Sequence, residues 1–178
     1  MIGLLRFVGV ANAAVWFGAS IFFTFSIGPA LFSREMIDML RLHGGIDSEA
    51  AKAYAGFVAQ IIIARYFVLH LVCGVIALLH LVTEWLYMGK PLQRLTLWLL
   101  LGIFALGLGE RVIILPRLND LHRAMYSASA TQQQRERAHH SFNVWHGASQ
   151  ALNLFLMTGV AVYLWRVSTP GSGYRYRV

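Results

Sequence analysis

The stretch that decides the fold is residues 131–166, which read TQQQRERAHHSFNVWHGASQALNLFLMTGVAVYLWR. It begins polar and ends apolar. Polar side chains recur along it at alternating steps of four and three residues, and the line they form is His139, Asn143, His146, Gln150, Asn153 and Met157. These steps keep all of them on one face of a helix. A polar stripe on an otherwise apolar helix is typical of a membrane bundle, where the stripe faces inward and the rest faces lipid.

The composition of the whole chain agrees with a membrane location. The chain has 178 residues, of which 57% are hydrophobic and 13% charged, whereas a soluble domain carries more charge. A spanning helix needs about 20 mostly apolar residues, and four stretches meet this requirement: 4–32, 57–88, 93–115 and 140–165. The sequence therefore predicts an all-α fold, an integral membrane antiparallel four-helix bundle in one domain of residues 1–167. Residues 168–178 are basic and rich in Gly, Pro and Ser, and we expect a flexible tail.

Helix-capping signals lie between the spans. Asp47 and the Thr131-x-x-Gln134 capping box should start the helices that lead into spans 2 and 4. Residues 33–45 and 117–127 carry apolar side chains on one side only, which predicts two short amphipathic helices at the membrane interface. Ser33 is the expected N-cap of the first of these, and Gly44-Gly45 its expected end.

Prolines and small residues give further expectations for the spans. Pro29 should bend or end span 1, and Pro116 should end span 3. The pairs Ala14/Gly18 and Gly102/Gly109 are spaced so that neighbouring helices could approach closely.

The net charge of +7 does not indicate a nucleic-acid partner, because the basic residues flank the apolar spans. Four spans put both termini on one side. We call the opposite side the crown, and it receives residues 33–56 and 116–139. Basic residues are almost equally numerous on the two sides, but the terminal-side segments are shorter and nearly free of acid. This favours an integral protein of the bacterial inner membrane with cytoplasmic termini. A single cysteine, Cys73, excludes an intrachain disulfide.

Polar residues within the spans concentrate in the crown half, where all four spans contribute. A charged group costs at least about 2.5–3.5 kcal/mol at the bilayer centre, so it usually faces the bundle interior and pairs. The expected partner of Glu110 is Arg65 or His146. The predicted binding cluster is Arg65, His70, Glu110, Arg111, His139, Asn143, His146, Gln150 and Asn153.

Two of these residues, His70 and His146, are candidate ligands of a metal ion or a haem iron, since neutral imidazole is a favoured ligand. The alternative is that the histidines form hydrogen bonds between helices. A copper site on the crown is a second possibility, with the donors Met36, Met39, His43, His122 and Met125. The same methionines suit the apolar side of interfacial helices, and we favour that interpretation.

Four segments together resemble a known family. They are GASIFFTFSIGPALF (18–32), AGFVAQIIIARYF (55–67), ERVIILPRLNDL (110–121) and FNVWHGASQALNLF (142–155). They resemble the transmembrane protein 205-like family, a four-span domain of unknown function. That family is similar in layout to copper-resistance D-type membrane proteins and to a haem-binding protoporphyrinogen oxidase group. The resemblance implies copper or haem b held by histidines inside a four-helix bundle.

Three functional hypotheses follow. The first is a protein that handles a metal ion or small solute through the polar cluster. The second is a haem-binding redox membrane protein, and the third is a non-catalytic scaffold or assembly partner in a larger membrane complex. No nucleophile-base pair, zinc-protease motif or nucleotide fingerprint is present, so the sequence leans away from an enzyme. Four spans are few for a complete transporter, which makes a homo-oligomer compatible with the first hypothesis.

Overall fold

The computed structural model describes residues 2–88 and 93–169, and throughout that part the regular elements are helices. In chain order these are α1 (Ile2–Phe22), the π-helix η1 (Phe23–Ile27), α2 (Gly28–Leu31), α3 (Arg34–Gly44), α4 (Ser48–Met88), α5 (Arg94–Gly109), the π-helix η2 (Glu110–Ile114), α6 (Leu115–Met125) and α7 (Gln132–Ser168). The predicted all-α membrane bundle is confirmed. Within the described residues, four helical stretches are long and apolar enough to span a membrane: Gly3–Leu31, Ser48–Tyr87, Arg94–Met125 and Gln132–Ser168. The predicted tail lies outside the described residues beyond Thr169.

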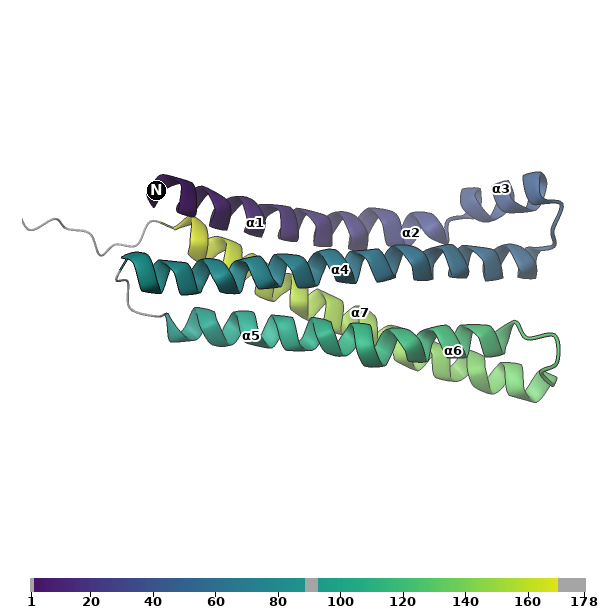
Figure 1. The fold of residues 1–178 in the computed structure, drawn as a ribbon. Helices are drawn as coiled ribbons and strands as arrows, with labels where there is room; N and C mark the ends of the chain where they lie inside the picture. Colours follow the sequence, from purple (N-terminus) through teal and green to yellow (C-terminus); the bar gives the residue numbers. More distant parts are fainter. Residues whose placement is uncertain (1, 89–92, 170–178) are drawn as a thin grey trace, which may run out of the picture.

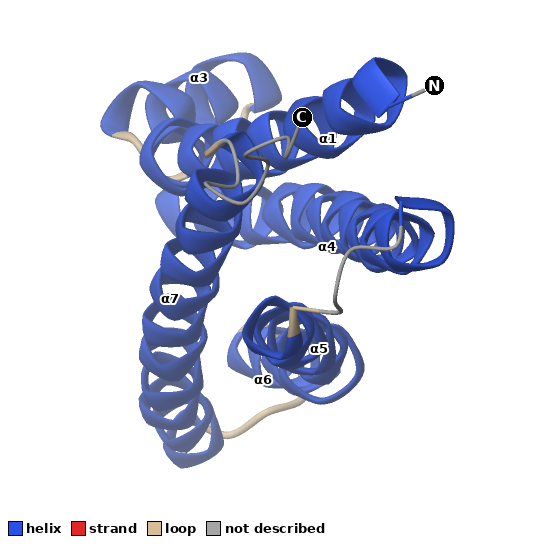
Figure 2. Cartoon of the chain, turned by 90° about the vertical axis from the view of Figure 1, so that its left-hand side faces the viewer, coloured by secondary structure: helices blue, strands red, loops and turns tan. Residues whose placement is uncertain are grey.

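The four long helical stretches form a layer of three with the fourth lying across it. Figure 1 shows α1–α2, α4 and α5–α6 running side by side, with α7 crossing them diagonally. In the end-on view, α1, α4 and α5 lie in a row and α7 covers one side of that row (Figure 2). Because α7 is oblique, it packs on α1 near the chain termini and on α6 near the crown. It therefore diverges from α2 on the crown side.

The capping signals work as the sequence predicts. The Asp47 carboxylate accepts a hydrogen bond of 2.7 Å from the Ala50 amide and starts α4 at Ser48. Thr131 and Gln134 form the reciprocal capping box that starts α7. Ser33 accepts from the Met36 amide at the start of α3. The helix is followed by the C-cap residue Gly45, whose φ of 61° is a conformation that glycine adopts without strain.

The prolines do not end their spans, which corrects the expectation for Pro116. In both spans a five-residue π-helix precedes the proline, and the helix continues beyond it. The amide of Gly28 donates to the Phe23 carbonyl, and that of Leu115 donates to the Glu110 carbonyl. A proline lacks the amide hydrogen and its ring clashes with the carbonyl four residues earlier, and the wider turn accommodates both effects. The second predicted amphipathic helix, α6, is thus continuous with span 3.

The core and the close helix contacts lie mainly in the half nearest the termini. The buried core there contains Trp16, Cys73, Leu100, Leu156 and Val160 among others. The expected contacts at Gly18, Gly102 and Gly109 are wrong, since a Cβ atom built at any of them meets no heavy atom within 4 Å in the described structure. The closely approached glycines are instead Gly9, Gly56, Gly74, Gly107 and Gly159. Spacing identified small residues, but the rotation of each helix decides which of them face a neighbour.

Candidate binding cavity

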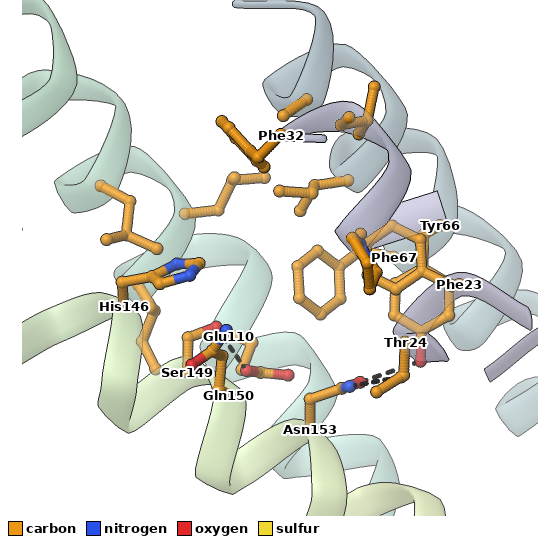
Figure 3. Close-up of a pocket in the computed structure, with 18 residues that line it drawn as sticks. Phe23, Thr24, Phe32, Tyr66, Phe67, Glu110, His146, Ser149, Gln150 and Asn153 are labelled. Carbon is orange, nitrogen blue, oxygen red and sulfur yellow. Dashed lines mark hydrogen bonds between the residues drawn. The ribbon is translucent and has the colours of Figure 1, made fainter. Parts of the chain in front are cut away.

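A cavity of about 440 Å³ lies in the crown half of the bundle, and we call it the crown cavity. Its volume falls within the range of about 300–1,000 Å³ that is usual for small-molecule sites. Segments η1–α2, α4, η2–α6 and α7 all contribute to its walls (Figure 3). Its lining is Phe23, Thr24, Gly28, Pro29, Leu31, Phe32, Ala59, Ile63, Tyr66, Phe67, Glu110, Ile114, Leu115, Leu118, His146, Ser149, Gln150 and Asn153.

The crown cavity reaches the surface of the bundle between α2 and α7. Phe32, at the end of α2, is 55% exposed, and Gln150 on α7 is also exposed, yet both line the cavity. These are the two segments that the oblique course of α7 separates (Figure 1). Phe32 directly follows the candidate span Gly3–Leu31, and Gln150 lies within the candidate span Gln132–Ser168, so the mouth opens on the side of the bundle.

One wall of the cavity is polar and is built around Glu110. The side chain is only 1% exposed, and its Oε1 atom accepts a hydrogen bond of 3.1 Å from the Ser149 hydroxyl (Figure 3). The Oε2 atom is buried and has no hydrogen-bond partner among the described residues. Glu110 does not form the expected ion pair with Arg65 or with His146. The ion pairs of the described structure join other residues.

A hydrogen-bond network crosses the cavity at Asn153. Its amide nitrogen donates to the Thr24 hydroxyl at 2.8 Å, and its Oδ1 atom lies 3.1 Å from the Tyr66 hydroxyl (Figure 3). The Tyr66 hydroxyl also lies 3.2 Å from the Ser20 hydroxyl, which donates to the Trp16 carbonyl. The network joins α1, η1, α4 and α7, so it fixes the relative positions of three spans at this depth.

His146 and Gln150 complete the polar wall and are not held by other side chains. The ring of His146 stacks on Phe142 with 5.6 Å between centroids and points toward the cavity (Figure 3). Neither His146 nor Gln150 makes a hydrogen bond through its side chain to another described residue. Both therefore have hydrogen-bonding capacity available to a molecule in the cavity.

His70 lies outside the crown cavity, packed between α1 and α5. Its Nδ1 atom accepts a hydrogen bond of 2.9 Å from the Trp16 indole. Its Nε2 atom faces Gly107 so closely that a Cβ atom there would lie 2.7 Å from it. Both ring nitrogens are thus occupied or covered, so the contacts of His70 do not fit a ligand of haem or of a metal ion. The described residues also contain no group of three or more His, Cys, Asp or Glu side chains able to hold a metal.

The other members of the predicted cluster lie elsewhere. Arg111 turns away from the cavity and donates to the Ala64 carbonyl on α4 at 3.1 Å. Arg65 is exposed on the surface of α4, and His139 and Asn143 are exposed on α7. The crown cavity therefore gathers four of the nine predicted residues: Glu110, His146, Gln150 and Asn153.

The sequence interpretation missed three polar residues of this site. Ser149 holds Glu110, while Thr24 and Tyr66 hold Asn153. Tyr66 lies four residues before His70, and the sequence already places both on one face of span 2, but the predicted cluster did not include Tyr66. Ser149 lies three residues after His146, so helical spacing could have found it. Thr24 sits within the π-helix η1, where the regular helical spacing does not apply.

These features define an integral membrane protein with four spanning helices and a lateral cavity of mixed polarity. A family model described as "Domain of unknown function (DUF4149)" matches residues 12–127, so the chain belongs to that family. The match includes the spans that supply Thr24, Tyr66 and Glu110 but ends before α7 begins. No curated protein and no solved structure matches the chain. The likeness to transmembrane protein 205 and to copper-resistance D-type proteins stays a prediction.

Proposed function

We propose that this protein binds a small, largely apolar solute in the crown cavity, with the polar end of the solute directed at Glu110. The observation that carries the proposal is the buried Oε2 atom of Glu110, which has no partner in the described structure although the residue itself lines a 440 Å³ cavity. Leaving a buried polar atom unpaired costs about 1–3 kcal/mol, and more when it is charged. A ligand that donates to Oε2 recovers that free energy.

The two π-helices support a binding role for the same place. Both η1 and η2 contribute lining residues, through Phe23, Thr24, Glu110 and Ile114. Short π-helices are rare, and they occur frequently at functional sites because they redirect side chains within a helix. Here the π-helix η2 begins at Glu110 itself.

The apolar lining and the lateral mouth indicate how a solute would arrive. Most of the lining side chains are aliphatic or aromatic, from Phe23 to Leu118. The mouth between α2 and α7 opens on the side of the bundle, so a solute dissolved in the membrane could enter without crossing water. Binding of a metal ion or of haem b has less support, because His146 lies at the cavity without a second histidine beside it in the described structure.

The test is binding of radiolabelled decanol to the purified protein in phosphatidylcholine nanodiscs, measured by scintillation proximity and displaced by unlabelled decanol. We expect saturable binding with one site per chain. The variant Gln150→Trp narrows the mouth without disturbing buried packing and should weaken binding about tenfold or more, which corresponds to about 1.4 kcal/mol. The matched control is Ala151→Trp, which places the same ring on the neighbouring, exposed position.

Absence of saturable binding beyond that of empty nanodiscs would overturn the proposal. So would an equal loss of binding in the Gln150→Trp and Ala151→Trp proteins, because the mouth would then have no special role.

A further inference from the structure

We propose that the natural solute is a lipophilic amine, whose ammonium group pairs with Glu110 while its hydrocarbon part fills the apolar half of the crown cavity. This inference rests on the proposed function and adds the charge of the ligand to it. The strongest ground is that the protein leaves this buried carboxylate without a positive partner.

Arg111 and Arg65 do not pair with Glu110 in the described structure. Arg111, the next residue, is engaged with the Ala64 carbonyl on α4. Arg65 is exposed at the surface of α4. His146 shares the cavity, yet its ring nitrogens and the Glu110 oxygens do not form an ion pair within residues 2–88 and 93–169. A buried carboxyl group is charged only where a cation or hydrogen bonds compensate it, and otherwise it takes up a proton. Ser149 supplies one hydrogen bond to one oxygen only, so a cationic ligand would stabilise the charged form.

The remaining groups at the polar wall suit an ammonium group. An ammonium carries three donors and no acceptor. The Oε2 atom of Glu110 can accept one of its hydrogen bonds, and the Gln150 side-chain oxygen and an unprotonated nitrogen of His146 can accept the others. The Asn153 and Tyr66 side chains are already bonded to each other. The polar wall thus offers acceptors to a donor group, with one formal negative charge among them.

The aromatic residues opposite suit the hydrocarbon part of such a ligand. Phe23 and Tyr66 stack face to face with ring centroids 4.2 Å apart, and Phe67 packs beside Tyr66 at 5.6 Å. All three line the cavity together with Phe32. Apolar and aromatic surfaces bury hydrocarbon favourably. A carboxylate ligand would be repelled by Glu110, and an alcohol would leave its charge uncompensated.

The experiment compares three ligands of equal chain length in displacing radiolabelled decanol from the protein in phosphatidylcholine nanodiscs: decylammonium, decanol and decanoate. We expect decylammonium to bind at least about tenfold more tightly than decanol, as one close charge pair in a desolvated site provides, and decanoate to bind more weakly than decanol. Glu110→Gln should lose the preference for decylammonium over decanol, with both affinities measured in the same variant protein. The control Glu136→Gln removes a carboxylate from the exposed start of α7 and should keep the preference.

A second variant keeps the test decisive if Glu110→Gln does not fold. Gln150→Lys adds a cation at the exposed mouth and should abolish the preference for decylammonium over decanol, with both affinities measured in the same variant protein. Equal affinity of the wild-type protein for decylammonium and decanol would overturn this inference, and so would a preference that persists in both Glu110→Gln and Gln150→Lys. Saturable decanol binding in those cases would still support the proposed function, whereas failure of decanol and decylammonium alike to bind would remove the proposed function itself.

Discussion

At the scale of single residues, buried histidines join the helices by occupying the space that glycines leave. His70 on α4 packs on Gly107 of α5, His80 on α4 packs on Gly9 of α1, and His122 on α6 packs on Gly56 of α4. Hydrogen bonds also hold two of these three histidine rings in place. The Trp16 indole donates to His70, and the Nε2 atom of His80 lies 3.0 Å from the Leu5 carbonyl. These glycines matter for their small size, since any side chain would displace the imidazole.

Replacing one of these glycines should therefore destabilise the bundle. In Gly107→Ala, the new Cβ atom would lie 2.6 Å from the Cδ2 atom of His70, and His70 cannot retreat because Trp16 holds its other edge. Overpacking of this kind costs about 1–3 kcal/mol. Thermal unfolding in mild detergent should show a lower midpoint for Gly107→Ala than for Gly102→Ala, where the added methyl group meets open space. Equal midpoints would show that His70 can move and is not a fixed contact.

The polar network at Asn153 gives a second prediction at this scale. Asn153→Ala leaves the hydroxyls of Thr24 and Tyr66 without their shared partner. Hydrogen bonds between spanning helices contribute about 0.6 kcal/mol each on average and up to about 1.7 kcal/mol, so we expect a loss of about 1–3 kcal/mol. The control is Asn143→Ala, since Asn143 is exposed and bonds within its own helix to His139. Urea-induced unfolding in detergent would measure both, and an equal effect of the two variants would contradict a structural role for the network.

At the scale of elements, the π-helix η2 joins two helices of span 3, α5 and α6, that bury different sets of side chains. In span 3, α5 buries Leu100, Ile103 and Gly107, whereas α6 buries Leu118 and Leu121. The additional residue that a π turn accommodates changes the direction of the following side chains. It sets Glu110 toward the crown cavity while Arg111, its neighbour, reaches α4.

Deleting one residue from η2 should therefore be far more harmful than changing it. Val112 is 62% exposed, so Val112→Ala should shift the unfolding midpoint little. Removal of Val112 lets the wide turn close to a regular α-turn, which redirects the Glu110 side chain and presses the Pro116 ring against the carbonyl four residues earlier. We expect the deletion protein to unfold at a clearly lower temperature than Val112→Ala and to lose decanol binding.

A deletion protein as stable as Val112→Ala would show that a regular α-helix is compatible with Pro116 and with the packing of α5 and α6. In that case η2 would have no part in shaping the crown cavity, and the support it gives to the proposed function would fall away.

The sequence predicted elements better than contacts, and span 3 shows why. The apolar length of span 3 follows from local composition, as the caps of spans 2 and 4 at Asp47 and Thr131 follow from local hydrogen bonding, and a sequence displays both directly. The neighbours of Glu110 depend on how far each helix is rotated, and a π-helix changes that rotation midway. Helical spacing thus placed His146, Gln150 and Asn153 correctly on one face of α7, but it could not show that Ser149, rather than Arg65 or His146, would bond to Glu110.

At the scale of the whole molecule, exposed aromatic side chains mark the membrane boundary nearest the termini. Trp85, Trp98 and Trp165 are 48%, 70% and 75% exposed and lie near the terminal ends of α4, α5 and α7. Aromatic residues gather at membrane interfaces, and a hydrocarbon layer corresponds to about 20 helical residues. The opposite boundary of the hydrocarbon is then expected about 20 residues from these tryptophans along each helix. That position is Arg65 on α4 and the neighbourhood of His146 on α7. The crown cavity thus lies at the far boundary of the hydrocarbon, where an amphiphilic solute keeps its polar end.

The orientation of the molecule gives the last prediction, and we infer that the termini are cytoplasmic. The terminal side is basic, with Arg6, Arg94 and Arg166, whereas the crown mixes basic residues with acids such as Asp47 and Glu136. Basic flanks stay in the cytoplasm. The lone native cysteine is buried, at 3% exposure, so an added cysteine can report its own side. In intact bacterial cells, a membrane-impermeant maleimide should label Ser129→Cys on the crown, and it should label Ser168→Cys only after the membrane is permeabilised. Both serines are exposed, so unequal reactivity would arise from sidedness alone, and labelling in the reverse order would place the crown cavity at the cytoplasmic boundary.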